Sequence, residues 1–137
     1  MEFIVQALLT ASVTAFVARV LLTFPFWSSG LAKAMDFQAT VGEMEHFGFT
    51  PGIAFGLATI IVQLSGSALV IANRLVWLGA GALAVFTALT IVLVHTFWKL
   101  EEPMATFSFY TAVEHVGMIG GLLLVSILSA REASARA

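Results

Sequence analysis

The sequence predicts an all-α integral membrane protein: a four-helix bundle with a short interfacial helix between its first and second spans. Charged residues are only 10% of the chain, 60% of it is hydrophobic, and its mean hydropathy is +1.01. Because a soluble domain carries about 25% charged residues, this composition indicates a chain that is solvated mainly by lipid. Four spans of about 20 residues use nearly all of the length, so we expect a single transmembrane domain over residues 1–137.

The first predicted span covers approximately residues 5–31 and lacks the short apolar region and cleavage site of a signal peptide. At about 1.5 Å per residue it exceeds the hydrocarbon core of roughly 30 Å. It must therefore tilt, kink near Pro25 or begin as a surface segment. Residues 36–49 carry apolar side chains at helical spacing among acidic ones, which predicts an amphipathic helix at the membrane interface. The remaining spans are expected at 52–72, 75–98 and 104–129.

Polar and small residues recur at helical spacing within three of the spans and predict their packed faces. In the first span they are Ser12, Ala15, Arg19, Thr23, Phe26, Gly30 and Lys33. In the second span they are Gly56, Thr59, Gln63, Gly66 and Ser67, and in the fourth they are Glu114, Gly117 and Gly121. Small residues of this kind let helix backbones approach closely, so we expect these faces to point into the bundle.

The distribution of basic residues predicts the orientation of the chain. Four spans place both termini on one side together with Arg74, Arg131 and Arg136, while Lys33 and Lys99 lie on the other side. The positive-inside rule therefore favours cytoplasmic termini. The net charge of -2 and the scattered basic residues exclude a nucleic-acid-binding role. The absence of cysteine excludes disulfides and thiolate metal sites.

The stretch from His95 to His115 is a polar interruption between two apolar runs and raises the question of a haem or metal site. A haem needs imidazoles at matching depth. If the fourth helix starts at Met104, the two histidines miss each other by about 12 Å, whereas a start at Tyr110 restores the match. The geometry thus disfavours haem. Glu114 and His115 point about 100° apart on a helix and no third ligand converges on them, so we predict no metal site.

The same region, together with the first two helices, has the groups that a quinone requires. A quinone needs a donor at each carbonyl, an aromatic wall and a route for protons. Donors are available from Arg19, Gln63, His95 and His115, and the wall from Phe97, Trp98, Phe107, Phe109 and Tyr110. Two alternatives remain open: the aromatic residues form an interfacial belt, or the polar groups only hydrogen-bond with one another within lipid.

Several short motifs, in order along residues 17 to 128, resemble the DoxX family of small four-helix membrane proteins. They are Arg19-Val-Leu-Leu, Ser29-Gly30-Leu-Ala-Lys33, Asp36-Phe37, Gln63-Leu-Ser-Gly66, Asn73-Arg74, His95-Thr-Phe-Trp98, Glu102-Pro103-Met104, Glu114-His115 and Gly120-Gly121-Leu-Leu-Leu. Two positions depart from the family pattern. The second helix usually carries Glu at the place of Gln63, and the fourth usually carries Lys-Asn at the place of Glu114-His115.

The resemblance implies two classes of function. Relatives include the small membrane subunit of a thiosulfate:quinone oxidoreductase, which implies a quinone-binding subunit in a bacterial inner membrane, at most one part of an oxidoreductase. It would act with a separate redox partner and hold no covalent cofactor. Other relatives resemble membrane chaperones and cargo receptors, which implies a non-catalytic assembly or anchoring subunit. For that class we expect homo-oligomers formed through the small residues 79–82.

The missing acid of the second helix suggests a partner for Arg19. A charge near the bilayer centre costs roughly 2.5 kcal/mol or more, so Arg19 needs an opposite charge or a route to water. We expect Arg19 to pair with Glu114, while Gln63 fills the remaining donor and acceptor positions. The alternative is that Arg19 extends toward a helix end.

Overall fold

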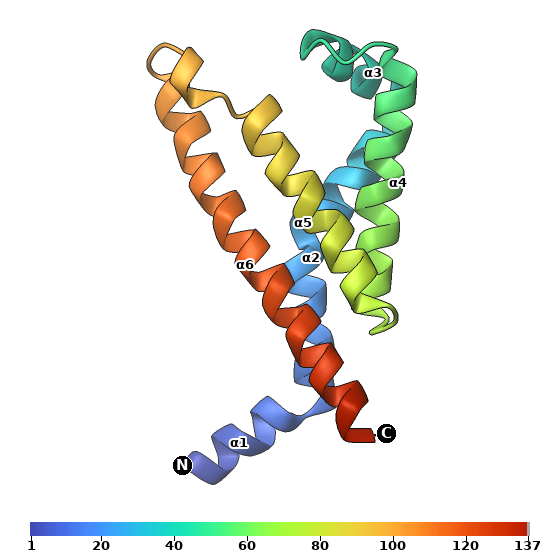
Figure 1. Ribbon diagram of the computed structural model, residues 1–137, viewed down its shortest axis with the longest axis vertical. Coiled ribbons are helices and arrows are strands. Elements are labelled where there is room, and N and C mark those ends of the chain that lie inside the picture. Colours follow the sequence, from blue (N-terminus) through green and yellow to red (C-terminus); the bar gives the residue numbers. More distant parts are fainter. Residues whose placement is uncertain (137) are drawn as a thin grey trace.

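The computed structural model describes residues 1–136, and over that range every regular element is helical (Figure 1). Four helices are long and apolar enough to cross a membrane: α2 (Ser12–Met35), α4 (Gly52–Ile71), α5 (Val76–Leu93) and α6 (Met104–Arg136). Three shorter elements accompany them: α1 (Glu2–Thr10), α3 (Phe37–His46) and the 3-10 turn η1 (Phe97–Lys99). The prediction of an all-α protein with four spans is confirmed.

The first apolar run forms two helices, so its long helix begins at Ser12 and not near residue 5 as predicted. The backbone is extended at Ala11 (φ −68°, ψ 134°), which separates α1 from α2. No residue of α1 is buried, and the helix turns away from the bundle at the end where both termini lie (Figure 1). Pro25 lies inside α2 without ending it. The excess length of the run is thus accommodated by a separate first segment.

A helix also forms within the predicted amphipathic segment. The Asp36 side chain caps α3 by accepting a hydrogen bond from the Ala39 backbone N–H at 3.0 Å. Thr40 donates through Oγ1 to the Lys33 carbonyl at 3.0 Å and so fixes α3 against the end of α2. The location of α3 at the membrane interface stays a prediction.

Helix α4 packs closely against α5 through a pair of glycines. A Cβ on Gly79 would lie 2.7 Å from the Gly66 carbonyl oxygen, so only the absence of a side chain allows this approach. The predicted inward face of α4 is confirmed, because Gly56, Gln63, Gly66 and Ser67 are all buried. On α6 the expected face is only partly packed: Gly121 meets Leu22, whereas Gly117 has no neighbour within 4 Å.

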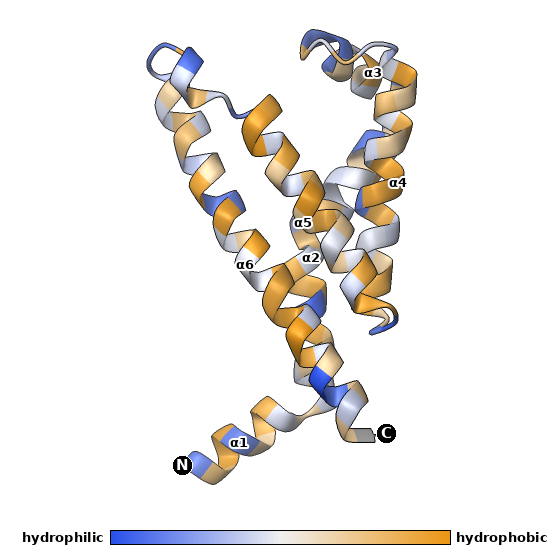
Figure 2. Cartoon of the chain, in the orientation of Figure 1, coloured by the Kyte–Doolittle hydropathy of each residue, from blue (hydrophilic) through white to orange (hydrophobic). Residues whose placement is uncertain are grey.

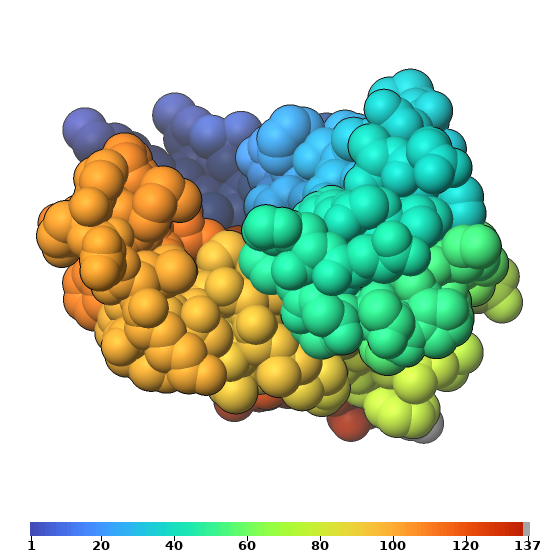
Figure 3. All heavy atoms as spheres, turned by 90° about the horizontal axis from the view of Figure 1, so that it is seen from above, coloured from blue at the N-terminus to red at the C-terminus, as the bar shows by residue number. Residues whose placement is uncertain are grey.

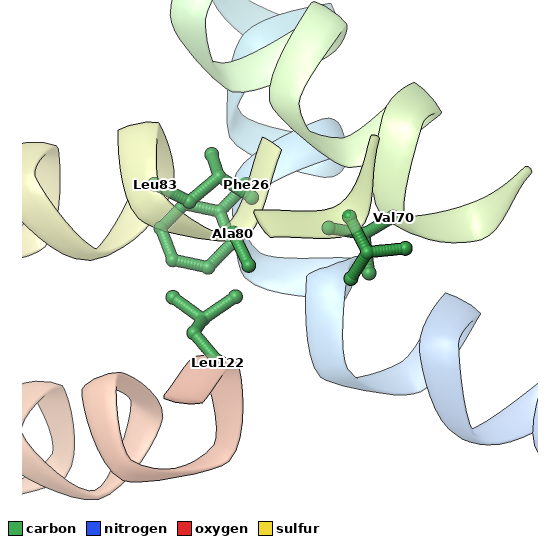
Figure 4. Packing of buried hydrophobic residues seen from close by; sticks show 6 residues of the cluster. Phe26, Val70, Ala80, Leu83 and Leu122 are labelled. Carbon is green, nitrogen blue, oxygen red and sulfur yellow. The ribbon is translucent and has the colours of Figure 1, made fainter. Parts of the chain in front are cut away.

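The buried apolar core lies in the half of the bundle nearer the termini. It joins three side chains from α5 and one from each of the other long helices: Phe26, Val70, Val76, Ala80, Leu83 and Leu122 (Figure 4). Hydrophilic residues gather toward the two ends of the bundle, and only a few blue segments interrupt the orange and white ribbon between them (Figure 2). Most other large apolar side chains are exposed on the outside, as expected where helices face lipid.

Candidate functional site

A cavity of about 710 Å³ occupies the other half of the bundle, nearer α3 and η1. Its lining residues come from α2, α3, α4, α5 and α6 and from the segment that follows α5. Phe26, Val62, Phe86 and Met118 line it and also belong to or pack on the core, so the core forms its floor. Figure 3 shows the bundle from the end away from this floor, where α3, the segment after α5 and the start of α6 lie toward the viewer.

The aromatic wall of the cavity differs from the predicted one. It consists of Phe26, Phe47, Phe49, Phe55 and Phe86. None of the predicted wall residues, which all follow His95, lines the cavity. They form an outer cluster in which Phe97 meets Trp98 and Phe109 edge to face, with ring centroids 5.0 and 5.3 Å apart. The reason is that the first turns of α6 bury Ser108 and Ala112 and turn their aromatic side chains outward, so that Phe107 and Tyr110 are exposed.

Gln63 is the deepest strongly polar residue of the cavity and is only partly satisfied. Its side chain is 5% exposed. Its Nε2 donates to Ser29 Oγ of α2 at 3.3 Å, while its Oε1 is buried without a hydrogen-bond partner. Because a hydroxyl both donates and accepts, Ser29 matches either orientation of the amide. Gln63 can therefore present an acceptor or a donor to the cavity.

His95 and His115 meet at the outer end of the cavity. Their rings lie edge to face with centroids 4.9 Å apart, and His115 Nδ1 is buried without a partner. The predicted difference of about 12 Å in depth between the two histidines is wrong, although α6 does begin at Met104. Helix α5 ends at Leu93, before His95, and the segment that follows continues outward from the bundle to the start of α6. His95 therefore lies deeper than a continuous helix would place it.

The charged groups of the cavity lie at the same end. Lys33 of α2 and Glu43 of α3 form an ion pair, the one such pair among the side chains of residues 1–135, and both line the cavity. Glu114 lines it from α6. Within the described part of the chain, His, Asp and Glu form no group of three or more that could hold a metal ion.

Arg19 and Glu114 do not form the predicted ion pair. Leu22 packs beside Gly121, Arg19 lies one turn closer to the termini than Leu22, and Glu114 lies two turns the other way. At 1.5 Å per residue the two backbones are about 15 Å apart along the bundle. Arg19 instead has its Nε buried without a partner, and helix geometry tilts its side chain toward the N-terminal end of α2.

Of the five predicted ligand-binding residues, Gln63, His95 and His115 line the cavity, and Arg19 and Trp98 do not. Other polar residues line the cavity that the sequence did not predict as ligand-binding: Ser29, Lys33, Glu43, Thr59, Thr87 and Thr90. Thr87 and Thr90 stand three residues apart on α5 and lead toward His95, which is the one sequence signal for them.

These features define a multi-pass helical membrane protein with a polar-ended cavity inside its bundle. A sequence model of the DoxX family matches residues 14–96, which is more than half of the chain, so the chain belongs to the DoxX family. The matched residues include Ser29, Gln63 and His95 but end before α6, which supplies Glu114 and His115. No curated protein and no solved structure matches the chain at a significant level.

Proposed function

We propose that this protein binds a quinone or a similar lipid-soluble redox molecule in the cavity, with the ring at Gln63. The observation that carries the proposal is the Gln63 Oε1 atom, which is buried without a partner on a side chain only 5% exposed. Buried polar atoms are nearly always hydrogen-bonded, so an unpartnered one that borders a cavity points to a ligand. A volume of about 710 Å³ lies within the usual range for small-molecule sites.

The chemistry of the two redox forms fits this amide. A quinone carbonyl accepts a hydrogen bond and a hydroquinone hydroxyl donates one. The Gln63 amide has a group for each, and Ser29 Oγ complements either orientation of the amide. Phe26 and Phe86 supply aromatic faces on the same cavity wall, where offset stacking or edge contacts stabilise a ring.

The chain acts, in this proposal, as the membrane subunit of a quinone-linked oxidoreductase. It has no cysteine for a redox disulfide or an iron–sulfur cluster, so a separate partner protein exchanges electrons with the bound ring. The three arginines at 74, 131 and 136 accompany the termini, which favours cytoplasmic termini in a bacterial inner membrane.

A second function, helix-mediated assembly without chemistry, has one observation in its favour. A Cβ added to Gly81, Gly117 or Gly120 would meet no neighbouring atom within 4 Å. These glycines are exposed on the outside of α5 and α6, where a partner helix can approach closely. The predicted oligomer surface over residues 79–82 is less suited, because Gly79 and Ala80 are buried inside the bundle.

Binding of decylubiquinone to the purified protein in nanodiscs tests the first function. Gln63→Leu should weaken binding at least tenfold, which corresponds to about 1.4 kcal/mol. Ser65→Ala is the matched control, since Ser65 is exposed on the same helix and donates only to the Ile61 carbonyl. Equal affinity in wild type and Gln63→Leu, or no binding by the wild type, would refute the quinone site. The assembly function would then be examined by cross-linking Gly117→Cys.

A further inference from the structure

The polar groups of the cavity form a one-sided arrangement. Gln63 lies near the middle of α4, and the apolar core lies between it and the termini. Every other strongly polar or charged residue that lines the cavity lies at the depth of Gln63 or on the side of α3 and η1. Val70, Leu83 and Leu122 are at most 1% exposed and fill the space on the terminal side. The polar residues that line the cavity therefore give a proton at Gln63 a route toward α3 and η1, whereas the buried Thr23 and Ser67 on the terminal side do not line it.

The wall that α5 contributes has hydroxyl groups along this direction. Thr87 donates to the Leu83 carbonyl at 2.7 Å, and Thr90 donates to the Thr87 carbonyl at 2.8 Å. Each hydroxyl proton is thereby used within the helix, and each oxygen keeps lone pairs that can accept. Thr87, Thr90 and His95 all line the cavity and succeed one another toward its outer end.

The His95–His115 pair stands at the end of this row. The two rings are in contact, come from different segments of the chain and both line the cavity. Because both side chains border the cavity, an imidazole nitrogen of the pair can accept a proton that comes from within it. Histidine is the side chain best suited to exchange a proton near neutral pH.

We propose that the His95–His115 pair exchanges protons between a ligand at Gln63 and the aqueous phase on the α3/η1 side, and that exchange occurs on this side alone. This inference rests on the proposed quinone function. In the forward step a hydroquinone O–H bond breaks, its electron pair stays on the oxygen, and the proton joins an imidazole nitrogen lone pair. The imidazolium then returns the proton to water, so that the pair is unchanged.

Three other charged groups lie at the end of the cavity where His95 and His115 meet, and they influence how the rate of proton exchange depends on pH. Glu114 precedes His115 on α6, while Lys33 and Glu43 contribute from α2 and α3 as a neutral ion pair. Among the lining residues from α4 and α5, none is charged. His46, the remaining histidine, is exposed on α3 and does not line the cavity.

Access from one side can be measured without a ligand, because the chain has no cysteine of its own. Thr90→Cys in sealed, oriented vesicles should react with a charged, membrane-impermeant thiol reagent added on the α3/η1 side and not on the side of the termini. Ser67→Cys, whose position is 1% exposed beside the core, should react from neither side. Labelling of Thr90→Cys from the side of the termini, or from neither side, would overturn the one-sided path even if decylubiquinone binds.

The role of the histidines is tested by oxidation of bound decylubiquinol in nanodiscs with ferricyanide. Two ferricyanide ions each take one electron from a decylubiquinol molecule as it releases two protons. His95→Ala and His115→Ala should slow the oxidation at least tenfold at unchanged decylubiquinol affinity, and added imidazole should restore the rate. His46→Ala should behave as wild type. Three results would each overturn the proton-exchange role. They are a wild-type rate in the variant that combines His95→Ala and His115→Ala, a failure of imidazole to restore the rate, and a tenfold loss of decylubiquinol affinity in the histidine variants. Failure of the quinone function is distinct, since wild type would then bind no decylubiquinol.

Discussion

Gln63 of α4 donates a hydrogen bond to Ser29 of α2 directly beside Gly30, the residue that brings the two helices together. A Cβ on Gly30 would lie 3.2 Å from the Gln63 Cβ and 2.9 Å from Leu64 Cδ2. The close approach of the helices and the position of the amide therefore have the same cause. Packing of α2 on α4 orients Nε2 toward Ser29 and leaves Oε1 for the cavity.

Gln63→Leu should leave the stability of the ligand-free protein unchanged or raise it. The substitution removes one hydrogen bond but also a buried acceptor without a partner, and such an atom costs about 1–3 kcal/mol. Thermal unfolding of the empty protein in nanodiscs measures this. Loss of binding together with retained stability is typical of a residue kept for function. A fall in midpoint of more than a few degrees would show that the amide is mainly structural.

Gly79→Ala should destabilise the bundle, whereas Gly81→Ala should not. The new methyl group at position 79 would lie 2.7 Å from the Gly66 carbonyl oxygen and 2.8 Å from Leu69 Cβ, and neither can move without shifting a helix. Overpacking of this kind costs about 1–3 kcal/mol. Position 81 has no neighbour within 4 Å, and alanine favours helix there. Equal unfolding midpoints for the two variants would contradict the α4–α5 contact.

Double-mutant cycles should separate the formed ion pair from the one that was predicted. Arg19→Gln and Glu114→Gln should have additive effects on the free energy of unfolding, within about 0.5 kcal/mol, because the two residues do not touch. Lys33→Gln and Glu43→Gln should show a favourable coupling of up to about 1 kcal/mol, since the Glu43 side chain is 44% exposed. A coupling above about 1 kcal/mol between Arg19 and Glu114 would restore the original ion-pair hypothesis.

Much of the fold followed from local patterns in the sequence. Hydropathy identified four spans, and the spacing of small residues identified the inward face of α4 around Gln63, because each depends on neighbours within one helix. The positions of the breaks at Ala11 and after Leu93 were not predicted, since neither place has a proline or a glycine that would end a helix. The second break decides the depth of His95, and so the contact with His115 was missed.

The cavity itself was beyond the reach of sequence patterns because five helices contribute to it. Gln63, His95 and His115 stood out as polar residues in apolar surroundings. The aromatic wall did not, because Phe26 and Phe55 look like any other lipid-facing or core residue until the helices are packed. The charge of Arg19 suggested a partner on energetic grounds, whereas its depth relative to Glu114 depends on how α2 and α6 are aligned.

Gly30→Ala should reduce decylubiquinone binding while leaving the fold intact. The added methyl group meets mainly the Leu64 side chain, which can move, but it also lies 3.2 Å from the Gln63 Cβ. The expected response is a small displacement of α4 that lengthens the bond to Ser29 beyond its present 3.3 Å and misplaces the amide. Gly121→Ala is the matched control, because its methyl group meets only the Leu22 Cδ1, and Leu22 lies two turns, or about 10 Å, along α2 from Ser29. We expect a several-fold rise in Kd for Gly30→Ala alone, with both variants unfolding within a few degrees of wild type. An unchanged Kd would show that the α2–α4 spacing does not position the amide.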